Sequence, residues 1–106
     1  IDRENLTGAL INLLKNAEEA MPGGGKINVT LAQHDECIAI CISDQGVGIP
    51  EKIKDKIFTP FFTTRDGGTG LGLALVRKVI DAHRGAILVA NNPDQGSTFT
   101  IELPLR

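Results

Sequence analysis

The chain has 106 residues, 42% of them hydrophobic and 23% charged, with a formal net charge of −2. We therefore expect residues 1–106 to form a single domain with a substantial core, and the mixed charge argues against nucleic acid or an anionic membrane as a partner. No stretch approaches the roughly 20 apolar residues of a membrane helix and the first residues do not resemble a signal peptide, so we expect a cytoplasmic domain.

The first predicted element is a helix over residues 2–21. Its apolar residues recur at helical spacing, and a Pro-Gly-Gly-Gly run at residues 22–25 ends it. On a wheel of about 100° per residue, Asn5, Asn12 and Asn16 fall along one border of the apolar stripe. Asparagine is a mediocre helix former. These residues are therefore either boundary residues bonded to neighbouring loops or, for Asn12 and Asn16, a functional pair.

Two strands follow, and we predict that they form a hairpin. Residues 26–31 alternate polar and apolar, which is typical of a half-exposed strand, whereas Cys37–Ser43 is apolar on both faces and is expected to be central. Cys37 and Cys41 would lie roughly 13 Å apart on one face, too far for a disulfide. Neither has a partner at zinc spacing, so we interpret both as buried thiols in a reducing cytoplasm.

Asp44 stands at the end of this buried strand, in the sequence DQGVGIP. A carboxylate is costly to place there unless something bonds to it. One interpretation is an Asx-turn, in which Asp44 caps its own loop. The other is an acceptor for the exocyclic amino group of a ligand, with Gly46 and Gly48 allowing that ligand to lie against the backbone.

Residues 51–68 show little periodicity beyond a helical turn over residues 51–57, and a long irregular connection of this kind is typical of a lid or binding loop. Phe58, Phe61 and Phe62 cluster here. They either pack in the core or anchor a movable segment to the domain. Arg65 follows at a position suited to reaching a phosphate.

Four glycines crowd into residues 67–72, immediately before a predicted helix over residues 73–83. Bare backbone at the start of a helix, with unpaired N–H groups and the positive end of the dipole, favours an anion such as phosphate. The alternative is a flexible glycine-rich surface loop. Two further strands are predicted at Ala86–Asn91 and residues 97–103, joined by a hairpin turn over residues 92–96.

Five blocks in this order resemble the catalytic, ATP-binding domain of bacterial sensor histidine kinases, with its N, G1, F, G2 and G3 boxes. The blocks are NLLKNA (12–17), DQGVGI (44–49), FTPFFTT (58–64), GTGLGL (68–73) and GSTFTIELP (96–104). The wording of the F and G2 boxes is most similar to the nitrogen-regulation type. The resemblance implies a two-layer α/β sandwich of the Bergerat type: a mixed, mostly antiparallel sheet on helices, in the order α-β-β-lid-α-β-β. Family domains usually begin one short strand earlier, so that edge strand is expected to be missing or incompletely paired.

The resemblance also implies a site for ATP and Mg²⁺. Asp44 would accept the adenine amino group, Thr98 would help through an ordered water, and Asn16 would bind the metal, with Asn12 supporting metal or phosphates. Because a neutral amide is a weak Mg²⁺ ligand, we expect metal binding only with nucleotide. The implied nucleotide-binding positions are Asn12, Asn16, Asp44, Gly46, Gly48, Ile49, Arg65, Gly68, Thr69, Gly70, Leu71, Gly72, Leu73 and Thr98. Among these, Ile49 and Leu73 would flank the base, and the glycine backbone would hold the triphosphate.

The implied activity is transfer of the γ-phosphoryl group to a histidine on a separate dimerisation domain, with a response regulator downstream. Related ATPases of the wider GHKL superfamily, such as DNA gyrase and the mismatch-repair proteins, carry a glutamate four residues before the asparagine that binds the metal. Here that residue is Asn12, which cannot take a proton, so hydrolysis as the main activity is disfavoured. His34 and His83 do not lie in an acceptor-like context, so the partner must supply the histidine, and the isolated domain is expected to be a monomer. The alternatives are a non-enzymatic ATP-sensing module, an ATPase and an anti-sigma-factor serine kinase.

Overall fold

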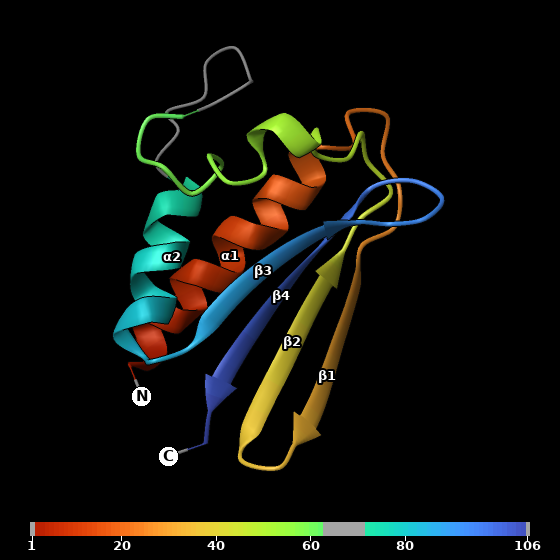
Figure 1. Ribbon diagram of the computed structural model, residues 1–106. Coiled ribbons are helices and arrows are strands. Elements are labelled where there is room, and N and C mark those ends of the chain that lie inside the picture. The colour runs from red at the N-terminus through yellow and green to blue at the C-terminus, as the bar shows by residue number, and fades with distance from the viewer. Residues whose placement is uncertain (1, 63–71, 106) are drawn as a thin grey trace.

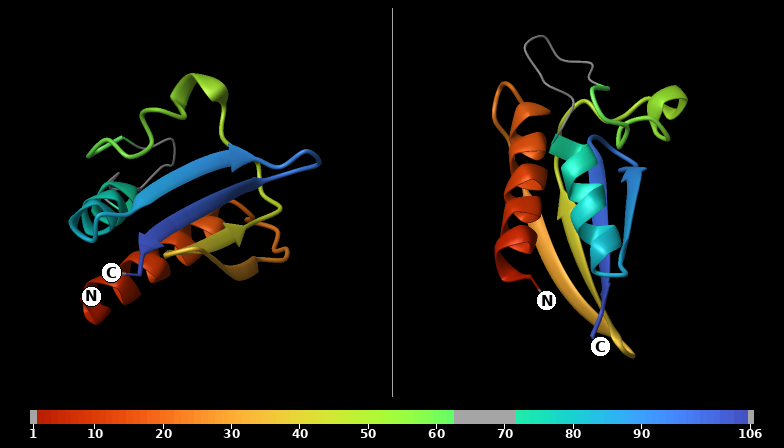
Figure 2. Two further views of the ribbon diagram at one scale, coloured as in Figure 1. Left: turned by 60° about the horizontal axis from the view of Figure 1, so that its bottom comes forward. Right: turned by 90° about the vertical axis from the view of Figure 1, so that its left-hand side faces the viewer.

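The structure, a computed structural model, describes residues 2–62 and 72–105. A four-stranded sheet forms one layer, and helices cover one of its faces (Figures 1 and 2). Within the described ranges, no helix has the length and hydrophobicity needed to cross a bilayer. The elements are α1 (Arg3–Glu19), β1 (Asn28–His34), β2 (Cys37–Ser43), the short 3-10 helix η1 (Glu51–Ile53), α2 (Gly72–Ala82), β3 (Ala86–Asn91) and β4 (Ser97–Pro104).

The helix predicted from the apolar stripe is α1, and its ends lie within two residues of the predicted ones. Asp2 caps its N-terminus by accepting the Asn5 N–H at 3.1 Å. The side chain of Asn5 also donates to Asp2, at 2.8 Å. Asn5 is therefore a capping residue at the exposed start of the helix, apart from the two later asparagines.

The sheet has the strand order β1-β2-β4-β3, and each of its three pairings is antiparallel. The predicted hairpin and the central position of β2 are confirmed, as is the two-layer α/β sandwich. The described strands contain no parallel pair, so the parallel part of the expected mixed sheet is not seen among them. The cross-strand partners Asn28, Ser43 and Thr98 share one face of the sheet, which we call the open face because the helices cover the other.

The core lies between the helices and the sheet. On β4 every second residue is buried, so that Ser97, Phe99, Ile101 and Leu103 point towards the helices. The largest fully buried hydrophobic side chains are Phe99, Leu13, Ile42, Ile80, Ile101 and Val76. Because of this alternation, the Ser97 hydroxyl points to the interior, whereas the Thr98 hydroxyl points to the open face.

The prediction that the first strand is half-buried is wrong. All seven residues of β1 are exposed, including Val29 at 58% and Leu31 at 71%. The reason is its position at the edge of the sheet, since α1 packs on β2 and α2 packs on β3. The cysteines are also less buried than expected: both are free and half-buried, and Cys41 lies on the open face, 3.5 Å from the Thr100 hydroxyl.

In residues 44–62, the described part of the connection after β2, the predicted helical turn over residues 51–57 is the 3-10 turn η1 followed by hydrogen-bonded turns. Phe58 packs edge-to-face on Phe99 with ring centroids 6.3 Å apart, and Phe62 packs against the core. Phe61 instead points outwards, 75% exposed and with a positive φ of 68°. Two of the three phenylalanines, Phe58 and Phe62, therefore anchor residues 58–62 of this connection to the core.

Candidate functional site

The elements that carry the predicted site meet at one end of the molecule. The C-terminal end of α1, the end of β2, the start of α2 and the β3–β4 turn all lie in the upper half of Figure 1, away from the two chain ends. Segments far apart in sequence thus lie close together there.

Asp44 is the buried acid of this region, with only 2% of its surface exposed. Its Oδ1 accepts the backbone N–H groups of Gly46 at 2.8 Å and Ser97 at 3.2 Å. Its Oδ2 accepts the Ser97 hydroxyl at 3.2 Å. The hydrogen bond from Gly46 forms the predicted Asx-turn, but it uses only one acceptor position of the carboxylate. A carboxylate offers roughly four acceptor positions, and three are used, so one position remains for a donor from outside.

Ser97, and not Thr98, is the hydroxyl residue at this carboxylate. The Thr98 hydroxyl donates to Asn92 Oδ1 at 2.6 Å on the open face of the sheet. Thr98, which was expected to help bind adenine through an ordered water, thus points to the face opposite Ser97, because neighbouring residues of a strand point to opposite faces. Its role at the adenine stays a prediction. Ser97 was missed from the sequence. The alternation of Phe99, Ile101 and Leu103 towards the core could have identified it.

The two glycines after Asp44 have different surroundings. Gly46 is buried, and a Cβ there would collide with the carbonyl oxygen of Ala20 at the end of α1. Its small size is therefore required by the packing of the loop on α1. Gly48 is half-buried and has a positive φ of 78°, which a residue with a side chain rarely adopts.

Asn12 faces the start of α2. Its Nδ2 donates to the Gly8 carbonyl of its own helix at 3.2 Å. A Cβ at Gly72 would lie 3.3 Å from Asn12 Oδ1, so the amide oxygen is turned towards α2. Asn16 is half-buried one turn further along α1. Within residues 2–62 and 72–105, no cluster of three His, Cys, Asp or Glu residues could hold a metal ion.

The two apolar residues expected beside the base, Ile49 and Leu73, are both half-buried and pack against the core. Asp44, Asn12 and Gly72 belong to the same end of the fold. The remaining predicted positions, Arg65, Gly68, Thr69, Gly70 and Leu71, lie outside the described residues.

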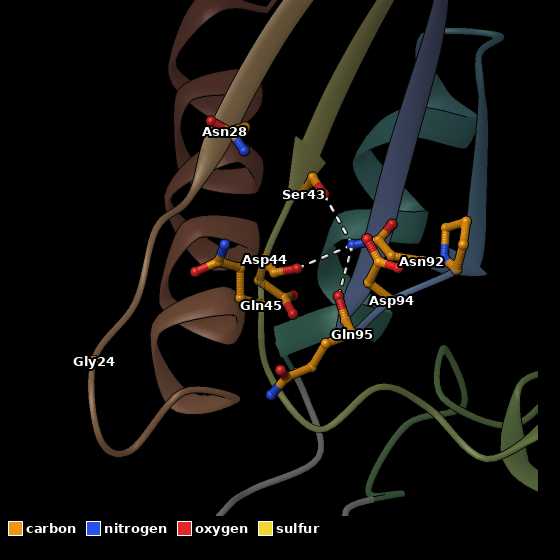
Figure 3. Close-up of a pocket in the computed structure, with 9 residues that line it drawn as sticks. Gly24, Asn28, Ser43, Asp44, Gln45, Asn92, Asp94 and Gln95 are labelled. Carbon is orange, nitrogen blue, oxygen red and sulfur yellow. Dashed lines mark hydrogen bonds between the residues drawn. The ribbon is translucent and has the colours of Figure 1, made fainter.

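A cavity of about 530 Å³ lies at the end of β2, on the side of the open face of the sheet (Figure 3). Its polar lining comes from Gly24, Asn28, Ser43, Asp44, Gln45, Asn92, Pro93, Asp94 and Gln95. It shares only Asp44 with the predicted site. Asn28 and Ser43 belong to the open face, so this cavity is distinct from the place where α1 and α2 meet.

The chain belongs to the family described as "Histidine kinase-, DNA gyrase B-, and HSP90-like ATPase", whose model matches residues 1–106. It is 50% identical over 105 residues to the signal transduction histidine-protein kinase AtoS of Escherichia coli (strain K12). That match covers 98% of this chain and 17% of the relative. The resemblance to histidine kinases is thus confirmed, and family membership supports ATP as the ligand.

Solved structures of histidine kinases have the same fold as this chain. A mycobacterial sensor histidine kinase, MprB, superposes with a TM-score of 0.91 at 38% identity, over 98% of this chain and 72% of that one. Full-length ShkA in complex with AMPPNP gives a TM-score of 0.87 at 31% identity, over 97% of this chain and 22% of that one. The fold is that of histidine-kinase catalytic domains.

Proposed function

We propose that this chain binds ATP with Mg²⁺ and presents the γ-phosphoryl group to a histidine on a separate helical dimerisation domain of a sensor kinase. The observation that carries the proposal is Asp44, a buried carboxylate with one acceptor position left after three internal hydrogen bonds. A carboxylate attracts the amino group of adenine and repels the carbonyl oxygen of guanine at the same place. The site therefore suits ATP better than GTP.

The phosphate end of the nucleotide would lie where α1 approaches α2. The amide oxygen of Asn12 is turned towards Gly72, the first residue of α2, whose opening turn has unpaired N–H groups. The amide oxygens of Asn12 and Asn16 would hold Mg²⁺ at this end, where its charge would stabilise the negative phosphates. Arg65 and the glycine backbone of residues 68–72 complete this end of the proposal.

Transfer is favoured over hydrolysis because the described part of the site contains no carboxylate on α1 facing Gly72. Asn12 occupies that place, and an amide cannot take a proton from water. Phosphoryl transfer depends mainly on positioning and charge stabilisation, so it needs no base from this chain. The relatives are much longer than the matched segment, and another domain of such a kinase would supply the histidine. A response regulator would then receive the phosphoryl group, in the cytoplasm.

Two measurements test the proposal. Calorimetric titration of the chain should show ATP binding in the presence of Mg²⁺ and weaker binding of GTP. A separately prepared helical domain carrying an acceptor histidine, mixed with the chain and radiolabelled ATP, should then acquire the label. Binding of ATP without transfer of the label would indicate an ATP-sensing module. If the chain releases free phosphate equally fast with and without the helical domain, it is an ATPase.

A further inference from the structure

The loop that follows Asp44 is fastened at its far end by Asn91, the last residue of β3. Asn91 Nδ2 donates to the Ile49 carbonyl at 2.7 Å, and Asn91 Oδ1 accepts the Ile49 N–H at 2.8 Å. The side-chain amide thus pairs with the backbone as a neighbouring strand would. The two residues are 42 positions apart in the sequence, so this contact, the Asn91–Ile49 clip, is a tertiary one.

The near end of the same loop is held by the next residue, Asn92, from the open face of the sheet. Its Nδ2 donates to the Asp44 carbonyl and to the Ser43 hydroxyl, each at 3.0 Å (Figure 3). The two asparagines that end and follow β3 therefore bond to opposite ends of the loop.

Between these two ends, Gln45 and Gly46 contact Met21 and Ala20 at the end of α1, so the exposed part of the loop begins at Val47. Val47 is 86% exposed. The Asn91–Ile49 clip supplies the bonds to the Ile49 backbone, and Ile49 is the residue expected to lie against the base. Gly48 gives an independent sign that the loop is built around this contact. It has a positive φ, and a Cβ there would approach Asn91 Oδ1 to 3.1 Å.

We propose that Asn91 is a positioning residue for the nucleotide site, holding the Asp44–Ile49 loop in its binding conformation before the ligand arrives. This inference rests on the proposed ATP-binding function. Without the clip, the loop would populate other conformations, and the measured affinity falls by the fraction of molecules that remain competent. Asn91 is exposed and absent from the core, so the fold itself should persist without the clip.

The test is Asn91→Ala, with Asn28→Ala as the matched control. Asn28 is an exposed asparagine at the start of β1, on the open face and away from Ile49. We expect Asn91→Ala to bind ATP about tenfold more weakly by calorimetry, corresponding to a competent fraction of about 0.1. Amide hydrogen exchange at Ile49 should accelerate in the free variant and slow again when ATP is added. The thermal midpoints of both variants should stay near that of the unchanged chain, and Asn28→Ala should bind ATP normally.

Two results would overturn the inference. One is unchanged ATP affinity in Asn91→Ala. The other is weaker binding accompanied by a large fall in thermal midpoint with no change in Ile49 exchange, because that pattern indicates general destabilisation. If the unchanged chain itself fails to bind ATP, the proposed function fails and the positioning role fails with it. The titration of the unchanged chain separates this case from a failure of the clip alone.

Discussion

Asp44→Asn separates the charge of the buried acid from its shape. In the structure, Oδ1 accepts two backbone N–H groups, from Gly46 and Ser97. An asparagine can keep both bonds through its amide oxygen. Its amide nitrogen would occupy the place of Oδ2 and could donate to the Ser97 hydroxyl, which also has acceptor positions. The internal bonds are therefore preserved, and we expect the fold to be retained.

The binding of adenine should suffer instead. The remaining acceptor position becomes an N–H donor, which faces the donor of the adenine amino group. Loss of a hydrogen bond to a charged group costs about 1.5–3 kcal/mol. ATP affinity should therefore fall about 10- to 150-fold. GTP should lose less or gain, because an amide N–H suits the guanine carbonyl oxygen, so the preference for ATP over GTP narrows.

The assay is calorimetric titration of the 106-residue chain with ATP and GTP at fixed salt and Mg²⁺. Asp94→Asn provides a control of identical chemistry, since Asp94 is an exposed carboxylate of the β3–β4 turn that lines the open-face cavity. It should bind ATP normally. The reasoning is refuted if Asp44→Asn folds, as judged by its thermal midpoint, and retains both its ATP affinity and its nucleotide preference.

Further predictions concern the neighbours of the acid, the metal and the packing of the loop. Ser97→Ala removes a hydrogen bond to the Asp44 carboxylate and should weaken ATP binding about tenfold. Thr98→Val should weaken it less, because the Thr98 hydroxyl lies on the open face. Equal effects of the two variants in parallel titrations would contradict this. Mg²⁺ should give no tight binding heat without nucleotide and a clear one with it, so tight binding to the free chain would disprove the amide-ligand assignment. Gly46→Ala forces α1 and the loop apart at Ala20 and should cost about 1–3 kcal/mol in urea unfolding; an unchanged midpoint would show that the contact is dispensable.

The elements with a strong local period were predictable from sequence. The apolar stripe of α1, the alternation of β4 and the short β1–β2 connection each specify their structure within a few residues, so α1 begins and ends within two positions of the prediction. The position of the acid was predictable as well. A carboxylate after a strand that is apolar on both faces must lie near the interior, and Asp44 does.

What could not be predicted depends on neighbours distant in sequence. The alternation in β1 looks like that of a half-buried strand, but its burial depends on how far the helix layer reaches across the sheet, and the layer leaves Val29 and Leu31 exposed. Matching a family block pointed to Thr98 and did not identify Ser97 as the hydroxyl that bonds to the carboxylate. In a strand a shift of one residue reverses the face, which is why Ser97 and not Thr98 meets Asp44.

The proposed nucleotide site would have two parts that depend on different elements. The base would bind beside the Asp44–Ile49 loop, which the β3–β4 hairpin reaches through Asn91, Asn92 and Ser97. The phosphates would bind where Asn12 of α1 faces the first residue of α2. Because the hairpin bonds would act on the base and the helices on the phosphates, a change in the hairpin should weaken the binding of ADP and of ATP by the same factor. A change at Asn12 should affect ATP more than ADP. On this proposal the two parts can vary independently: the sheet would set the nucleotide selectivity, and the helices would set the metal dependence.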